Sequence, residues 1–166
     1  DANGHSLNFR STTSTLVYRF TGTEITTPWT NVPLNTWTHI AVVRNSTATN
    51  GTSLYINGNL ISSFTVTNDF SKSTYLIGKT FDNYYYTGFI SNLRVLKGTA
   101  LYTSAFTPST TSLTAIANTS LLTAQNTTVV DNSSNALTIT NNGSVTYSLN
   151  SPFTSSTSGG TVATNV

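Results

Sequence analysis

Short runs of alternating apolar and polar residues recur along the chain and predict β-strands. Residues 6–10 and 15–20 are the first two such runs, with a Ser/Thr turn between them. The clearest local signal is a hairpin, in which residues 53–57 and 59–64 flank the pair Asn57-Gly58. Asn and Gly tolerate the positive φ angles of a type I′ turn, whose twist matches that of the flanking strands.

Two longer runs predict extended strands. Residues 36–44 are the longest apolar run, too short and too rich in β-branched side chains for a helix, and they predict a central strand buried on both faces. Residues 85–97 alternate along their length and predict one long strand. Further short strands are expected at residues 74–78, 121–124, 127–131, 136–140 and 144–149.

The number and spacing of these strands indicate an all-β protein. Short strands at intervals of roughly 8–12 residues are typical of a two-layer antiparallel sandwich, and a closed barrel is the alternative. A chain of 166 residues is long enough for one well-packed domain. The 11% share of aromatic residues argues against disorder, although Ser, Thr and Asn fill nearly half of all positions.

Charged residues make up only 7% of the chain, which argues against partners that are recognised through charge. Seven basic and five acidic residues give a net charge of +2, and the basic residues are scattered, so we expect no nucleic-acid partner. No apolar run approaches the roughly 20 residues of a membrane span, and none is expected. The chain contains no Cys, which excludes disulfides.

Four segments carry a family resemblance. They are WTHIAVVR at 37–44, LYING at 54–58, IG at 77–78 and GFISNLRV at 88–95. In this order and at these spacings they resemble the laminin-G-like domains of the concanavalin-A-like lectin and glucanase superfamily, over residues 6–108. The resemblance implies a jelly-roll sandwich whose core comprises residues 1–112.

The C-terminal part leaves two arrangements open. Members of the resembled family begin with a segment of the type D-x-S-x-N, whereas here such a segment, DNSSN, lies at residues 131–135. Residues 113–153 therefore complete either this sandwich or that of a neighbouring copy, because an incomplete sandwich leaves a sheet edge with unpaired backbone groups. Residues 154–166 are predicted to be a flexible tail or linker.

The segments KGTALY at 97–102 and FTP at 106–108 are similar to a subgroup found in virion and surface proteins of aquatic bacteriophages and bacteria. This resemblance implies an extracellular, cell-surface or virion location and an adhesive or structural role. The implied partners are a glycan or cell-surface polysaccharide and neighbouring copies of the chain. The alternative is a fibre subunit that assembles by strand complementation without binding glycans.

The chain lacks the carboxylate pair that glycosidases of this superfamily need. Such enzymes use two acidic residues close together, whereas Glu24 is the only Glu and no acidic residue lies within several positions of it. His5, near the N-terminus, is expected to be exposed, and His39 is expected to be a hydrogen-bonded residue of a buried strand. We therefore predict a non-enzymatic protein, with a polysaccharide-degrading enzyme as the remaining alternative.

Aromatic and polar residues gather in the segment FDNYYY at 81–86, which leads into a predicted strand. Loops of this kind often display binding groups, and sugar-binding sandwiches use aromatic rings with Asn, Asp and Arg. Alternation puts Tyr84 and Tyr86 on one face and Tyr85 on the other. The glycan-binding candidates are Asp82, Asn83, Tyr84, Tyr86 and Trp29.

No obligatory cofactor is expected. Laminin-G-like domains sometimes hold Ca²⁺ with hard oxygen ligands, and this resemblance makes Asp69 and Asp82 the candidate metal ligands. The alternative is that both are ordinary turn residues.

Overall fold

A computed structural model describes residues 4–69, 74–80, 82–142, 145–153 and 160–163 of the chain. The chain forms two compact units, each built from segments that are separate in the sequence. Unit 1 comprises Asp1–Thr80 and Ala100–Pro108, and unit 2 comprises Phe81–Thr99 and Ser109–Val166. The predicted core of residues 1–112 thus lies mostly in unit 1, with residues 81–99 and 109–112 in unit 2.

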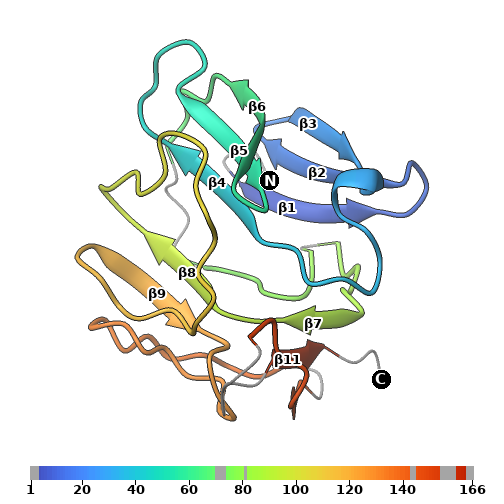
Figure 1. The fold of residues 1–166 in the computed structure, drawn as a ribbon, viewed down its shortest axis with the longest axis vertical. Coiled ribbons are helices and arrows are strands. Elements are labelled where there is room, and N and C mark those ends of the chain that lie inside the picture. The colour runs from blue at the N-terminus through green and yellow to red at the C-terminus, as the bar shows by residue number, and fades with distance from the viewer. Residues whose placement is uncertain (1–3, 70–73, 81, 143–144, 154–159, 164–166) are drawn as a thin grey trace. The chain divides into compact units, whose positions relative to one another are not determined.

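In the described part of unit 1, the strands form two three-stranded antiparallel sheets (Figure 1). The first, drawn in blue, has the order β1-β2-β3, and the second, drawn from cyan to green, has the order β4-β5-β6. The strands are β1 (His5–Arg10), β2 (Thr15–Phe20), β3 (Thr23–Pro28), β4 (Ile40–Arg44), β5 (Thr52–Ile56) and β6 (Asn59–Phe64). A 3-10 turn, η1 (Trp29–Asn31), follows β3.

Two-residue turns close two hairpins of unit 1. Asn57 and Gly58 have φ angles of 49° and 80°, as the predicted type I′ turn requires. Thr21 and Gly22, with φ angles of 40° and 83°, connect β2 to β3 in the same way. The sequence did not predict β3, because its residues TEITTP carry too little apolar alternation to be recognised.

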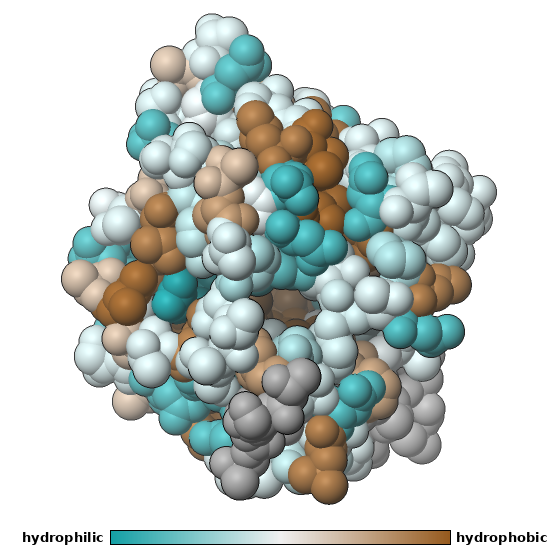
Figure 2. All heavy atoms as spheres, in the orientation of Figure 1, coloured by the Kyte–Doolittle hydropathy of each residue, from teal (hydrophilic) through white to brown (hydrophobic). Residues whose placement is uncertain are grey.

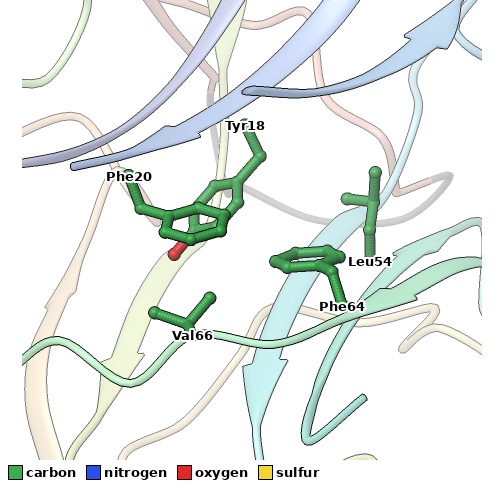
Figure 3. Packing of buried hydrophobic residues seen from close by; sticks show 5 residues of the cluster. All are labelled: Tyr18, Phe20, Leu54, Phe64 and Val66. Carbon is green, nitrogen blue, oxygen red and sulfur yellow. The ribbon is translucent and has the colours of Figure 1, made fainter. Parts of the chain in front are cut away.

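The core of unit 1 lies between its two sheets (Figure 3). Tyr18 and Phe20 of β2 pack against Leu54 of β5, Phe64 of β6 and Val66. The ring centroids of Tyr18 and Phe64 are 5.5 Å apart, and those of Phe20 and Phe64 are 5.8 Å apart. Each such buried side chain contributes about 1.5–3 kcal/mol to folding. The predicted all-β, antiparallel sandwich fold is therefore confirmed.

In the sheet β4-β5-β6 of unit 1, β5 is the strand that is buried on both faces. The sequence predicted this place for residues 36–44, but β4 begins only at Ile40, lies at the edge of its sheet and is half-buried throughout. In β5, Leu54 faces the core, and the adjacent Tyr55 is only 2% exposed. β5 is central because it pairs with β4 on one side and, through the hairpin, with β6 on the other. β4 is therefore an edge strand of this sheet.

Residues Ala100–Pro108, here called the covering segment, shield Tyr55. Phe106 meets the Tyr55 ring edge-on at 5.5 Å and stacks on Tyr102 at 3.6 Å. The backbone N–H of Phe106 donates to the carbonyl oxygen of Gly58 over 3.0 Å. A Cβ at Gly58 would collide with the carbonyl oxygen of Phe106, so only glycine permits this approach.

The described residues of unit 2 form five short strands in two antiparallel sheets. One sheet has the order β10-β11-β7 and the other pairs β8 with β9. The strands are β7 (Gly88–Ile90), β8 (Leu93–Leu96), β9 (Thr119–Thr123), β10 (Thr146–Ser148) and β11 (Gly160–Ala163). β9 and β11, both from residues 109–166, thus pair with β8 and β7 of the same chain.

The single long strand predicted at residues 85–97 is wrong, because Asn92 interrupts it. Asn92 has a φ of 55°, which no strand accommodates, so β7 ends at Ile90 and β8 begins at Leu93. The backbone N–H of Asn92 donates to Ala124 over 2.8 Å, and its side-chain oxygen accepts from the N–H of Leu113 over 2.7 Å. These bonds replace the ladder that a continuous strand would have made.

Other predicted strands are also absent or displaced. No strand forms at residues 74–78, 127–131 or 136–140. In the predicted strand 144–149, residues 146–148 form β10, and residue 144 lies outside the described residues. Residues 160–163 belong to the predicted flexible tail, yet they form β11, whereas residues 154–159 and 164–166 lie outside the described residues.

The segment DNSSN at 131–135 is bonded to β9. One oxygen of the Asp131 carboxylate accepts from the N–H groups of Leu122 (3.0 Å) and Ser133 (2.9 Å). The other accepts from the N–H of Leu137 (2.9 Å) and from the hydroxyl of Ser133 (2.8 Å). Desolvation acts to raise the pKa of this carboxyl, but the donated bonds outweigh it and lower the pKa of Asp131 to about 2.

Candidate functional site

Residues 82–86, here called the tyrosine loop, lie in unit 2 just before β7. Asn83 adopts a φ of 62°, a conformation that Asn tolerates better than most residues. Asp82 and Asn83 are exposed, Tyr84 is 73% exposed and Tyr85 is 53% exposed. The loop therefore presents two aromatic rings next to a carboxylate and a carboxamide.

Tyr86 differs from its two neighbours because its ring lies against the backbone of Gly88. A Cβ on Gly88 would approach the Tyr86 hydroxyl oxygen to 2.8 Å. This packing half-buries the ring, and the burial raises the pKa of Tyr86. The expectation that Tyr84 and Tyr86 share a face assumed a strand from residue 85, whereas the loop continues to residue 87. The most exposed rings belong to Tyr84 and Tyr85.

Trp29, the second candidate platform, begins η1 in unit 1 and is half-buried. The backbone N–H of Trp29 donates to the carbonyl oxygen of Ser14 (3.0 Å), and the backbone carbonyl oxygen of Trp29 accepts from the N–H of Val32 (2.7 Å). The indole Nε1 is buried and has no hydrogen-bond partner among the described residues. Trp29 belongs to unit 1 and the tyrosine loop to unit 2.

The two candidate calcium ligands are also divided between the units. Asp69 is exposed in unit 1, and Asp82 is exposed in unit 2. Across the residues that the structure describes, no three His, Asp or Glu side chains gather as a metal-binding group would require. Each Asp therefore stands as a single carboxylate in its own loop.

One comparison with known proteins identifies the family. A laminin-G-type family model, described as the Concanavalin A-like lectin/glucanases superfamily, matches residues 1–105. The chain belongs to this superfamily. The predicted resemblance is thus confirmed at the level of the superfamily. The comparisons with curated proteins and with solved structures found no match.

The one glutamate of this concanavalin-A-like chain is held in ion pairs. Arg10 donates from both terminal nitrogens to the Glu24 carboxylate, over 2.8 and 2.6 Å, and Nε of Arg19 lies 3.4 Å from it. The hydrogen bonds from Arg10 lower the pKa of Glu24. A glycosidase acid needs a raised pKa, so Glu24 is unsuited to that role.

Both histidines of the chain pack against aromatic rings. The prediction that His5 is exposed is wrong, because its ring is half-buried and stacks on Phe20. Its Nδ1 lies 2.9 Å from the Tyr18 hydroxyl, and desolvation lowers its pKa. His39 lies just before β4, half-buried, and meets the ring of Phe106 edge-on at 5.5 Å.

Unit 2 of the concanavalin-A-like chain also contains a depression of about 280 Å³ that no sequence pattern predicts. No motif marks it, because its residues come from a Thr/Asn-rich stretch that looks like many others in the chain. The residues that line it are Asn126, Thr127, Thr128, Val129, Val130, Asn141, Val145 and Tyr147.

The surface matches the low charge of the sequence. In Figure 2, pale residues of intermediate hydropathy cover much of the visible face, and the brown apolar residues form separate patches. Within the described part of the chain, no helix has the length and apolar character needed to cross a membrane.

Proposed function

We propose that the chain is a non-enzymatic carbohydrate-binding module that serves in adhesion, and that the tyrosine loop contacts the sugar. The observation that carries the proposal is the pair of exposed rings of Tyr84 and Tyr85, at 73% and 53% exposure, beside Asp82 and Asn83. The superfamily description, which covers lectins and glucanases, supports carbohydrate as the ligand class.

The chemistry of the loop suits a sugar ring. One face of a pyranose ring carries C–H groups that pack on an aromatic ring, and its hydroxyls bond to polar side chains. Tyr84 and Tyr85 supply the rings, and Asp82 and Asn83 supply oxygen and amide groups. Trp29 offers a second, half-buried ring in unit 1.

Binding without cleavage is favoured by the state of the acidic groups. Glu24 is held by two arginines, and Asp131 accepts four hydrogen bonds from its own unit. Both carboxyls have lowered pKa values, whereas a general acid requires a raised one. Binding is also proposed to need no metal ion, since among the described residues neither Asp69 nor Asp82 belongs to a group of three His, Asp or Glu side chains.

The module is proposed to act outside the cell, on a cell surface or in a virion appendage. The segments KGTALY and FTP, similar to a subgroup of phage and bacterial surface proteins, support this placement. The low share of charged residues, 7%, supports it further, because hydroxyl and amide side chains hydrogen-bond to polysaccharides without requiring charge.

A polysaccharide pull-down followed by a glycan array tests the sugar-binding function. We expect Tyr84→Ala and Tyr85→Ala to weaken binding at least about tenfold each, because each removes an exposed stacking ring. Tyr86→Phe is the matched control, since it keeps the ring against Gly88 and should bind like the wild type. The same assay with a chelator should show no loss. Unchanged binding by both alanine variants would contradict the proposed role of the loop.

A second candidate function is assembly by strand exchange between copies. It is favoured by the way residues 109–166 supply β9 and β11, which pair with β8 and β7 from residues 81–99. If that segment paired with β7 and β8 of the next copy, head-to-tail contacts would build a fibre.

Mixed single-cysteine variants test the exchange, since the chain has no Cys of its own. Val95 and Leu121 are register partners on β8 and β9. Val95→Cys mixed with Leu121→Cys should form a disulfide-linked dimer if strands exchange, whereas the pair Val43→Cys and Ser53→Cys, partners within β4 and β5, should not. Failure of the first pair to cross-link at any protein concentration would rule out this assembly.

A further inference from the structure

The depression in unit 2 is formed by two segments, residues 126–130 and residues around β10. Its volume of about 280 Å³ is close to the lower end of the range for small-molecule sites, about 300–1,000 Å³. It is therefore large enough for a ligand of the size of one sugar residue and too small for most cofactors.

Two carboxamides at the depression have unused hydrogen-bonding groups. The side-chain oxygen of Asn126 accepts from the N–H and the hydroxyl of Thr128, both over 3.2 Å. This orientation leaves the two N–H donors of Asn126 free. Asn141 is oriented in the opposite way, because its Nδ2 donates to the carbonyl oxygen of Val145 over 3.1 Å, which leaves its side-chain oxygen free to accept.

The apolar part of the lining includes an accessible aromatic ring. Tyr147 of β10 is 38% exposed and Val130 is 44% exposed. None of the described residues that line the depression is charged at neutral pH. Donors, acceptors and an aromatic ring without charge match an uncharged ligand that carries both hydroxyls and C–H faces.

We propose that this depression binds one residue of a neutral sugar, with the Asn126 amide donating to a hydroxyl, Asn141 accepting from a hydroxyl, and Tyr147 packing on the ring. It is a second binding site, built from residues other than those of the tyrosine loop. The ligand class rests on the proposed carbohydrate-binding function, but the location does not depend on the loop.

Titration of the ¹⁵N-labelled full chain with methyl glycosides of neutral hexoses, followed by NMR, tests the proposal. The side-chain amide signals of Asn126 and Asn141 should shift at millimolar sugar, the affinity expected of a small open site. Signals of the tyrosine loop report independently on the other site. If the shifts are confined to the loop, or if no glycoside shifts Asn126 and Asn141, this proposal is overturned while the loop assignment is judged on its own signals.

A conservative variant gives the second readout. Asn126→Asp keeps the oxygen that accepts from Thr128 but removes the free amide donors, so the sugar should bind about three- to tenfold more weakly. Asn142→Asp introduces the same charge at an exposed residue outside the lining and should leave the affinity unchanged. Tyr147→Phe should retain binding because it keeps the ring. Equal affinity of Asn126→Asp and wild type would overturn the proposal.

Discussion

Asp131 illustrates how a single carboxylate organises an irregular segment. Its two oxygens accept from three backbone N–H groups and one hydroxyl, on residues that lie in β9 and in the loop 133–137. Residues 131–137 form no strand, so these bonds replace the ladder that would otherwise satisfy their N–H groups. The position therefore depends on an ionised Asp.

This dependence predicts a specific response to acid. The pKa of Asp131 is about 2 in the folded chain against an ordinary value of 3.8, so the unfolded chain takes up the proton first. The stabilising contribution is complete above about pH 4 and is lost as the pH falls towards about 2. Asp131→Asn should lower the free energy of unfolding by about 1–2 kcal/mol at neutral pH, a value that allows for solvent screening.

Denaturant titrations across this pH range measure the effect. The stability difference between wild type and Asp131→Asn should shrink as the pH falls through the window. Asp69→Asn, at an exposed position of unit 1, is the control and should follow the wild type. A difference that stays constant down to low pH would show that the carboxylate charge has no part in the stability.

At the level of the element, local turn chemistry was predictable and strand continuity was not. Asn57-Gly58 specified a hairpin from two residues alone, and the structure has it. In contrast, alternation across residues 85–97 concealed the break at Asn92, because the left-handed turn there is stabilised by bonds to Leu113 and Ala124, distant in sequence. Patterns report local preferences, whereas such breaks depend on tertiary partners.

The hairpin turn also supports a prediction about Gly58. Gly58→Ala introduces a side chain both at a positive φ and against the carbonyl oxygen of Phe106. We expect it to lower the free energy of unfolding by about 2–4 kcal/mol, since left-handed strain alone costs about 1–2 kcal/mol. Thermal and denaturant unfolding measure the difference.

Gly22→Ala is the matched control for Gly58→Ala. Gly22 has a φ of +83°, close to the +80° of Gly58, but a Cβ there meets nothing within 4 Å. It should show only the strain, about 1–2 kcal/mol. Equal losses for the two variants would mean that the contact with the covering segment contributes nothing to stability.

At the level of the whole molecule, the small number of charged residues limits long-range electrostatic attraction between the chain and a ligand. Seven basic and five acidic residues leave a net charge of +2, and two of the arginines already pair with Glu24. Long-range attraction of a charged partner is weak under these conditions. Recognition then depends on short-range stacking and hydrogen bonds, at the tyrosine loop and in the depression of unit 2.

Sugar binding should therefore be nearly independent of ionic strength. Between about 50 mM and about 500 mM NaCl the Debye length shrinks severalfold, yet the affinity should change less than about twofold because the proposed ligand carries no charge. Titration calorimetry at several salt concentrations measures this. A steep fall in affinity with salt would indicate an oppositely charged ligand and would contradict the expectation of a neutral sugar.

The candidate sites were predictable only in part. The aromatic and polar residues at 81–86 predicted the tyrosine loop as a candidate site. The exposure of Tyr85 and the packing of Tyr86 on Gly88, however, depend on the conformation of the loop, which the alternation of residue types does not predict. No motif or pattern in the sequence predicted the depression around Asn126 and Tyr147. Its binding character depends on which side-chain amide atoms already form hydrogen bonds, and this depends on the three-dimensional structure.

The contact between Gly58 and Phe106 determines where the protein can be truncated to a minimal folded fragment. The family match ends at residue 105, one position before the ring that covers Tyr55. A fragment cut at that boundary would keep the hairpin but expose a buried tyrosine and forfeit the hydrogen bond to its tip. The homology limit and the physical limit of the fold thus differ, and a fragment should include the whole covering segment, through Pro108, to keep Tyr55 of β5 buried.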